Sequence, residues 1–138
     1  MTTDQIQLVQ QSWKQVLPIA ETAGTLFYNR LFEIAPEVRP LFGDDLKPQI
    51  AKLMGMLGMV VTNLTQLGTL VPKVEELGRR HGKYGVEPAH FDKVGEALLW
   101  TLEKGLGDAW QPDVATAWTT AYTTLANVMI EAMEVVEA

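Results

Sequence analysis

The sequence predicts an all-α fold class, and three of its features support this prediction. Apolar residues recur at intervals of three and four along almost the whole chain, which is the spacing of one face of a helix. Prolines and glycines separate these apolar runs and stand where helices commonly begin or end. No segment alternates between apolar and polar residues as a half-buried strand does. We therefore expect six or seven helices of unequal length in a single domain over residues 1–138.

The first helices are bounded by a capping box and by two prolines. Thr2 and Gln5 have the spacing of a capping box, so a helix is expected to begin there, and Pro18 lies near its end. A second helix is expected from about Glu21. Pro36 stops this helix, because proline removes a backbone donor, and can open a short third one.

Glycines mark the expected ends of the helices in the middle of the chain. A long helix is predicted from near Lys47, and Gly68 is expected to break it. A short helix follows around Pro72, and Gly82 and Gly85 supply left-handed exits from it.

The two remaining helices each begin at a proline. Pro88 opens one that Gly105 and Gly107 are expected to end, and Pro112 opens the last. Helices of such different lengths favour crossed packing around a pocket over a regular up-and-down bundle.

The composition narrows the classes of function. Of the 138 residues, 47% are apolar and 20% are charged, as in a globular protein. The formal net charge of −6 makes nucleic acid and membrane surfaces poor partners. The absence of cysteine excludes disulfides, thiolate zinc sites and iron–sulfur clusters. The N-terminus lacks a basic stretch followed by an apolar one, so we expect no signal peptide and a cytoplasmic location.

His81 is the clearest candidate for chemistry. It falls on an apolar stripe with Val74 and Leu77, and burying an imidazole there costs free energy unless it is hydrogen-bonded or ligated. A structural histidine bonded to a carbonyl remains open. Zinc needs three or four protein ligands, which a chain with one other histidine and no cysteine supplies poorly. Haem brings four nitrogens and needs as little as one protein ligand, so the lone inward histidine favours haem.

Tyr28 and Gln49 form a second pair of candidates. Tyr28 lies in a strongly apolar helix, where a buried hydroxyl needs a partner. Gln49 precedes Leu53 by four residues and therefore belongs near the apolar stripe of its helix. Each residue taken alone is compatible with a purely structural role. No motif for a serine hydrolase or a phosphate-binding loop competes with these candidates.

These motifs together resemble the bacterial single-domain globins, the family related to Vitreoscilla haemoglobin and to the globin part of flavohaemoglobins. The resemblance covers nearly the whole chain. It rests on five segments in a fixed order, namely Leu26 to Tyr28, Pro36 followed by Phe42, Gln49 with Leu53, Leu77 to Val86 around His81, and Ala117 to Tyr122.

The resemblance implies a globin fold of six to eight helices packed around haem b, which is iron protoporphyrin IX. It implies that His81 is the axial metal ligand and that its other ring nitrogen donates to a backbone carbonyl, that of Leu77. The further implied contacts are Phe42 against the porphyrin face, Leu77 and Val86 on the proximal side, and Tyr28, Gln49 and Leu53 around the gas ligand.

One departure from the family concerns the surroundings of the proximal histidine. Flavohaemoglobins usually carry a tyrosine and a glutamate that form a network with it. The aligned positions here are Phe91 and Met133, and neither side chain can serve as that partner. The strong proximal push associated with peroxidase-like or nitric oxide dioxygenase chemistry is therefore in doubt.

The resemblance implies reversible O2 binding with high affinity and slow release, for oxygen transport or storage. Three alternatives stay open. The first is nitric oxide dioxygenation, with NO as the ligand and a separate reductase; the second is gas sensing; and the third is an all-α interaction module in which His81 is structural. The sequence also leaves open whether Gln49 coordinates ferric iron and whether the protein is a monomer or a homodimer.

Overall fold

The computed structural model describes residues 1–83 and 86–137, and within these ranges it is helical and contains no strand. This confirms the all-α fold class. The described α-helices are α1 (Thr3–Val16), α2 (Ala20–Ile34), α3 (Lys47–Thr62), α4 (Leu67–Lys83), α5 (Pro88–Leu106) and α6 (Pro112–Glu137). Short 3₁₀-helices occur at Leu17–Ile19, Pro36–Leu41, Leu64–Gln66 and Gly107–Ala109.

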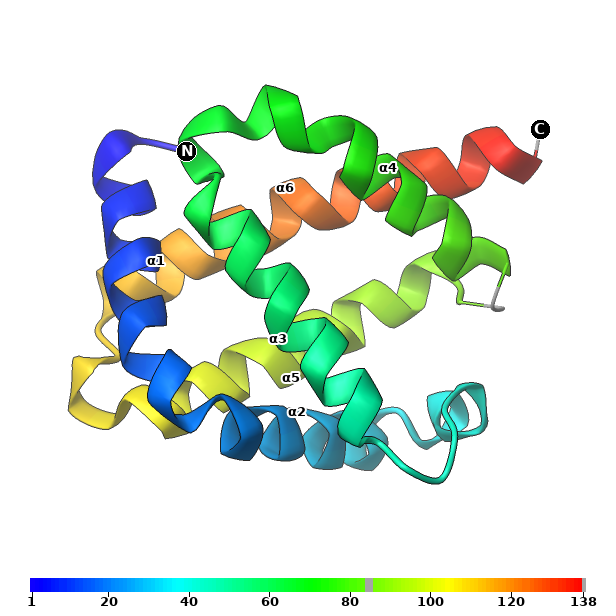
Figure 1. Ribbon diagram of the computed structural model, residues 1–138, viewed down its shortest axis with the longest axis horizontal. Helices are drawn as coiled ribbons and strands as arrows, with labels where there is room; N and C mark the ends of the chain where they lie inside the picture. Colours follow the sequence, from blue (N-terminus) through cyan, green and yellow to red (C-terminus); the bar gives the residue numbers. More distant parts are fainter. Residues whose placement is uncertain (84–85, 138) are drawn as a thin grey trace.

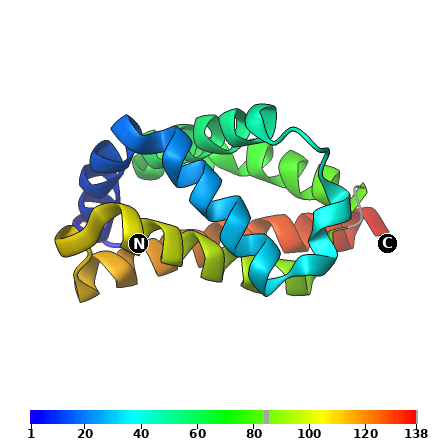
Figure 2. The same cartoon turned by 90° about the horizontal axis from the view of Figure 1, so that it is seen from below.

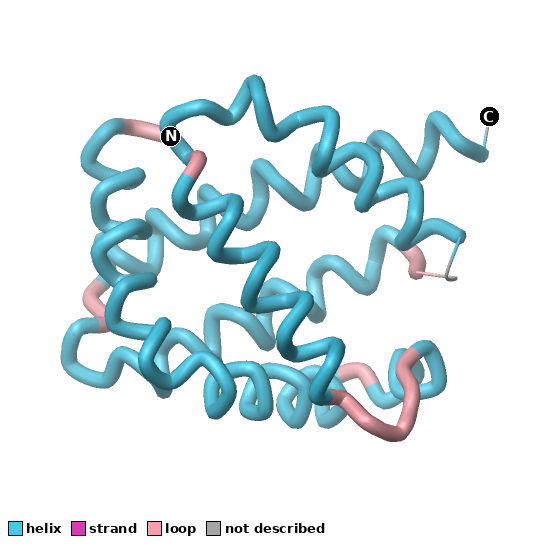
Figure 3. Tube along the Cα trace, in the orientation of Figure 1, coloured by secondary structure: helices cyan, strands magenta, loops and turns pink. Residues whose placement is uncertain are grey.

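The helices cross one another in two layers. Helix α4 packs along α6, α2 packs against α5, and α1 packs against α6 (Figure 1). Seen from below, α3 and α4 lie on one side of the molecule and α5 and α6 on the other, with α2 crossing in front of them (Figure 2). The connections are short, and a longer loop precedes α3 (Figure 3).

The predicted helix starts are confirmed where they rest on local hydrogen bonds. Thr2 and Gln5 form the capping box, because the Thr2 hydroxyl accepts from the Gln5 N–H at 3.1 Å and the Gln5 side chain accepts from the Thr2 N–H at 3.0 Å. Pro88 and Pro112 are the first residues of α5 and α6. A proline suits this position because its missing N–H would have no helical partner there.

The prediction that Gly68 breaks the long helix is wrong. Helix α3 ends at Thr62, where the side-chain amide of Asn63 donates to the carbonyl of Met59 at 2.8 Å. Gly68 instead lies in the first turn of α4. The helix around Pro72 is also longer than expected, with 17 residues.

The predicted helix exits at glycines have mixed outcomes. Gly107 adopts a positive φ of 54° directly after α5 and ends it as predicted. Gly82 and Gly105 lie inside helices, so the prediction that they end them is wrong. Gly85 lies outside the described residues. Glycine permits a left-handed exit but does not impose one.

The core is apolar, and a buried polar contact joins its distant segments α1 and α6. The indole N–H of Trp118 in α6 donates to the hydroxyl of Ser12 in α1 at 2.8 Å. That hydroxyl also lies 2.7 Å from the carbonyl of Leu8, so both polar groups are satisfied. No single described helix is both long and apolar enough to cross a membrane, although α3 and the following segment, bent by 65°, meet this criterion as a pair.

Two glycines allow helices to approach closely. A methyl group at Gly24 in α2 would collide with the side chain of Ile50 in α3. A methyl group at Gly78 in α4 would lie 2.5 Å from the carbonyl oxygen of Met129 in α6. The Met129 carbonyl belongs to the backbone, so it cannot change rotamer to make room as a flexible side chain can.

Gly78→Ala is expected to lower the free energy of unfolding by about 1 to 3 kcal/mol, because α4 must move away from α6. Gly55→Ala is the matched control, since a methyl group there meets nothing within 4 Å. Its expected effect is a gain of about 1 kcal/mol from better helix propensity. Urea unfolding of both variants measures the difference, and equal effects would contradict the close approach at Gly78.

Candidate functional site

Tyr28 is buried at the centre of a group of aromatic rings. Its side chain is 3% exposed and lies in α2. Burial raises the pKa of the Tyr28 phenol to about 12, and a hydrogen bond with the side chain of Gln49 partly offsets this rise. The phenol therefore stays protonated at neutral pH, and it is held next to an amide from the first turn of α3.

Phe32 and Phe42 confine the ring of Tyr28. The Phe42 ring meets the Tyr28 ring edge to face, with 5.4 Å between the ring centroids. Phe32 lies 6.0 Å from Tyr28 and 5.5 Å from Phe42 by the same measure. Such tilted and edge-on arrangements match the preferred geometry of aromatic pairs.

The chain brings this group together at one corner. Helix α2 ends at Ile34, and the 3₁₀-helix Pro36–Leu41 turns the chain so that Phe42 comes back against Tyr28. The close approach of Ile50 to Gly24 then places the first turn of α3 on α2. Gln49, one residue before Ile50, is brought to Tyr28 by this crossing.

His81 occupies the last turn of α4 and is half-buried. Its Nδ1 lies 2.6 Å from the carbonyl oxygen of Leu77, which is the partner that the sequence resemblance implied. A carbonyl oxygen only accepts, so Nδ1 carries the proton and the acceptor lone pair of a neutral ring is on Nε2. The carbonyl of His81 accepts from the N–H of Val86 at 3.1 Å.

Apolar residues lie beside His81. The rings of His81 and Phe91 have centroids 6.3 Å apart. Phe91 packs in one cluster with Met133, which is 2% exposed, and with the half-buried Val86. Phe91 and Met133 are thus buried together on the α5–α6 side of the histidine.

Tyr122 is a contributor that the sequence analysis missed. Its hydroxyl donates to the carbonyl of Phe91 at 2.6 Å, and its ring fits against Gly95, where a methyl group would be 2.8 Å away. Burial, with the nearby Asp92 carboxylate, raises the pKa of the Tyr122 phenol. Its helical spacing from Trp118 could have indicated burial, but the sequence gives no information about a partner 31 residues away.

The candidate residues fall into two groups at one end of the molecule. The second half of α2 and the start of α3 supply the group around Tyr28, and the end of α4 and the start of α5 supply the group around His81 (Figure 1). The remaining sequence candidates are half-buried, with Leu53 one turn after Gln49 in α3 and Leu77 one turn before His81 in α4.

The residues present fit a haem group better than a bare metal ion. No cluster of three or more metal-ligating side chains occurs in the described part of the chain. Helix α3 is strongly apolar, yet Leu53, Met54 and Leu57 are only half-buried. Within residues 1–83 and 86–137, α3 has its extensive helix contacts with α2 and α1 rather than with α4 or α5. A flat apolar group with one imidazole ligand matches this half-covered face and this donor set.

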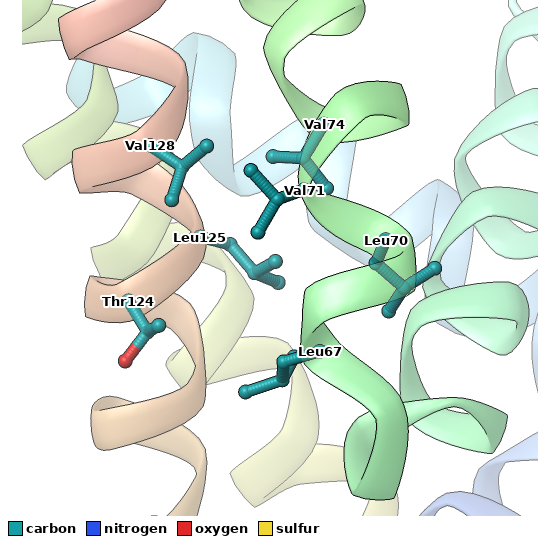
Figure 4. Close-up of a pocket in the computed structure, with 7 residues that line it drawn as sticks. All are labelled: Leu67, Leu70, Val71, Val74, Thr124, Leu125 and Val128. Atoms are coloured by element: carbon teal, nitrogen blue, oxygen red, sulfur yellow. The ribbon is translucent and has the colours of Figure 1, made fainter.

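A separate small pocket lies between α4 and α6 and has a volume of about 30 Å³ (Figure 4). The surface that its lining exposes to the pocket is apolar. The lining residues are Leu67, Leu70, Val71, Val74, Thr124, Leu125 and Val128. Pockets for drug-sized ligands measure roughly 300 to 1,000 Å³, so this one cannot hold a porphyrin.

Comparison with known proteins gives matches along the whole chain. A family model described as globin matches residues 25–129. The chain is 33% identical over 124 residues to a flavohemoprotein of Bacillus subtilis strain 168, covering 85% of this chain and 31% of the relative. It is 32% identical over 143 residues to a leghemoglobin of Medicago sativa, and the match covers 96% of this chain and 97% of the leghemoglobin. A flavohemoprotein of Vibrio cholerae is 30% identical, and 34% of its length is covered. The chain thus spans about a third of these flavohemoproteins.

Solved structures share the fold. A bacterial globin of Campylobacter jejuni superposes with a TM-score of 0.86 at 24% identity over 99% of both chains. An engineered carbene transferase made from a candidate nitric oxide dioxygenase of Rhodothermus marinus has a TM-score of 0.88 at 26% identity, covering 99% of this chain and 96% of that one. A hexacoordinated heme protein of a tardigrade has a TM-score of 0.88 at 17% identity, and the match covers 97% of this chain and 96% of that one. These matches confirm the expected globin fold.

Tyr28→Phe is expected to flatten the pH dependence of stability between about pH 10 and 12. In the unfolded chain a phenol titrates near pH 10, whereas burial holds the Tyr28 pKa at about 12 in the fold. The stabilising contribution is complete below the unfolded value and is lost as pH rises through the folded one. Urea unfolding across this window measures it. Thr101→Val, which removes another buried hydroxyl, should keep the wild-type dependence of unfolding free energy on pH. A wild-type dependence in Tyr28→Phe would contradict the raised pKa of the Tyr28 phenol.

Proposed function

Because the chain belongs to the globin family, we propose that it holds haem b between the two groups of residues and binds a diatomic gas, O2 in the first place, reversibly. The observation that carries this proposal is the pairing of Tyr28 with Gln49 at the same end of the fold as a histidine oriented by a carbonyl. When bound, haem supplies four nitrogens and an iron that can coordinate a gas molecule.

His81 would hold the iron through Nε2. The proton on Nδ1 is fixed by the Leu77 carbonyl at 2.6 Å, which selects the tautomer whose lone pair is on Nε2. A hydrogen bond to the second ring nitrogen also fixes the orientation of a metal-ligating imidazole. Leu77 and Val86 would pack on this side of the macrocycle, and Phe42 would lie against its face.

Tyr28 and Gln49 would donate hydrogen bonds to the gas. The phenol keeps its proton at neutral pH because its pKa is about 12, and the amide of Gln49 also has N–H groups to donate. Fixed donors stabilise a ligand that gains negative charge when it binds. At roughly 1 kcal/mol per hydrogen bond, and more for a charged acceptor, the two could slow gas release by about one to two orders of magnitude. Leu53 would keep the site dry.

Oxidation of nitric oxide with a separate reductase is the second candidate function. The name of one structural neighbour favours it, because that protein is an engineered form of a candidate nitric oxide dioxygenase. The described residues on the α5–α6 side of His81 favour simple binding instead. Phe91 and Met133 have no acidic or hydroxyl group that could draw the proton of the imidazole and make it a stronger electron donor.

His81→Ala is expected to abolish axial coordination and most haem retention, because it removes the one protein ligand that the proposal gives the iron. The absorption spectrum of protein purified with adequate haem measures this in ferric, ferrous and O2-exposed states. His90→Ala is the matched control, since His90 caps α5 through the Glu87 N–H at 3.1 Å and should leave the spectrum unchanged. Unaltered pigment content in His81→Ala would overturn the proposed ligand.

Tyr28→Phe is expected to raise the O2 dissociation rate about tenfold, because it removes one donor worth roughly 1 to 1.5 kcal/mol. Stopped-flow displacement of O2 by carbon monoxide gives the rate. Thr101→Val removes a buried hydroxyl that bonds Ala97 in α5, outside both groups, and should leave the rate unchanged. A wild-type rate in Tyr28→Phe would remove this residue from the mechanism.

A further inference from the structure

Arg39 holds the corner that carries Phe42 through several contacts. Its Nη1 donates to the carbonyl of Phe42 at 3.3 Å and to the carbonyl of Gly43 at 3.1 Å. Its own carbonyl accepts from the Phe42 N–H at 3.1 Å. The guanidinium also lies over the ring of Phe32, with 5.0 Å from its carbon to the ring centroid.

These contacts differ from those of the other charged arginines. Arg30, Arg79 and Arg80 pair with glutamates one helical turn away. Arg39 pairs with no carboxylate in the described part of the chain, and its guanidinium bonds two carbonyls and covers a ring instead. Hydrogen bonds from a cation to carbonyl oxygens are stronger than neutral ones. Arg39 is thus placed to order backbone rather than to balance charge.

The corner after Phe42 has few other anchors. Residues 43–45 are exposed, and α3 begins without a side-chain cap from Leu46. In this stretch the Asp45 carboxylate accepts from the Lys47 N–H at 3.1 Å, and the half-buried Leu46 packs against the core. Loss of Arg39 would therefore free the backbone of Phe42 more than a single lost contact usually does.

The two rings that Arg39 restrains both contact Tyr28, whose ring also meets Phe27 from its own helix at 4.9 Å. Phe42 meets the Tyr28 ring at 5.4 Å and Phe32 meets it at 6.0 Å, and these rings are 5.5 Å from each other. The direction of the Tyr28 hydroxyl depends on where its ring lies. A shift of the corner would therefore reach the hydroxyl through ring contacts alone.

We propose that Arg39 is a positioning residue for gas binding. It fixes Phe32 and Phe42, and these two rings hold the ring of Tyr28. Through these contacts Arg39 influences the rate at which the gas leaves. Arg39 acts through these neighbours and need not touch the gas. This inference rests on the proposed function, because it concerns the same hydroxyl.

The first experiment compares gas dissociation rates in Arg39→Gln, Tyr28→Phe and the double variant. Arg39→Gln should raise the O2 dissociation rate about three- to tenfold, the range expected for couplings through packed side chains. The double variant should release O2 no faster than Tyr28→Phe alone, because Arg39 acts through Tyr28. Arg30→Gln is the matched control, since Arg30 also lies over an aromatic ring, that of Trp100 at 5.2 Å, and should leave the rate unchanged.

The second experiment measures position directly. Aromatic NMR of the carbon monoxide complex, whose iron is diamagnetic, reports the contact between the Tyr28 and Phe42 rings. That cross-peak should weaken in Arg39→Gln and persist in Arg30→Gln. Should Arg39→Gln not fold, Arg39→Lys keeps the charge but loses the planar fork, and a smaller change of the same sign is expected in both measurements.

Each outcome decides the inference. A wild-type rate in Arg39→Gln, or a double variant whose effects simply multiply, would overturn it while Tyr28→Phe still supported the proposed function. If Tyr28→Phe itself leaves the rate unchanged, the proposed function fails at that residue. The NMR contact then decides the positioning role of Arg39: a weakened cross-peak supports it and an unchanged one overturns it.

Discussion

The buried hydroxyl of Tyr28 imposes the constraint on which the rest of the site depends. A phenol enclosed by aromatic rings needs a hydrogen-bond partner, since leaving it unpaired costs roughly 1 to 3 kcal/mol. Gln49 is the partner that the fold provides. It reaches Tyr28 because α3 crosses α2 where Gly24 leaves room for Ile50. The polar pair is therefore a product of helix packing, and the pair in turn keeps a protonated donor inside an apolar region.

The histidine side of the site is organised differently. The orientation of His81 is set within α4 itself, by a carbonyl four residues earlier. Its neighbours Phe91 and Met133 are apolar and belong to a small cluster between α5 and α6. Tyr122 secures that cluster by its bond to the Phe91 carbonyl. A ligand held by local geometry and packed against apolar groups suits stable coordination more than strong electron donation.

The fold class and the helix starts were predicted well, whereas helix ends at glycines and contacts between distant segments were not. The capping box of Thr2 and Gln5 needs only residues three apart, so its pattern specifies its geometry. Gly68 failed as a helix end because glycine lowers helix stability without supplying a stop, whereas Asn63 bonds the final carbonyls. The bond from Trp118 to a serine 106 residues away could not be foreseen, because it exists only once α1 lies on α6.

In the candidate site, too, some residues could be predicted from the sequence and others could not. Resemblance supplied the residues expected to face a ligand, including Tyr28 and His81, because their types recur at family spacing. It did not supply Arg39, whose bonds to the next carbonyls are local but whose contact with Phe32 forms across the break at Pro36. The histidine is fixed inside one helix, whereas the tyrosine depends on a corner that is largely exposed. Substitutions at that corner should therefore change how long a gas stays bound more readily than whether haem is held.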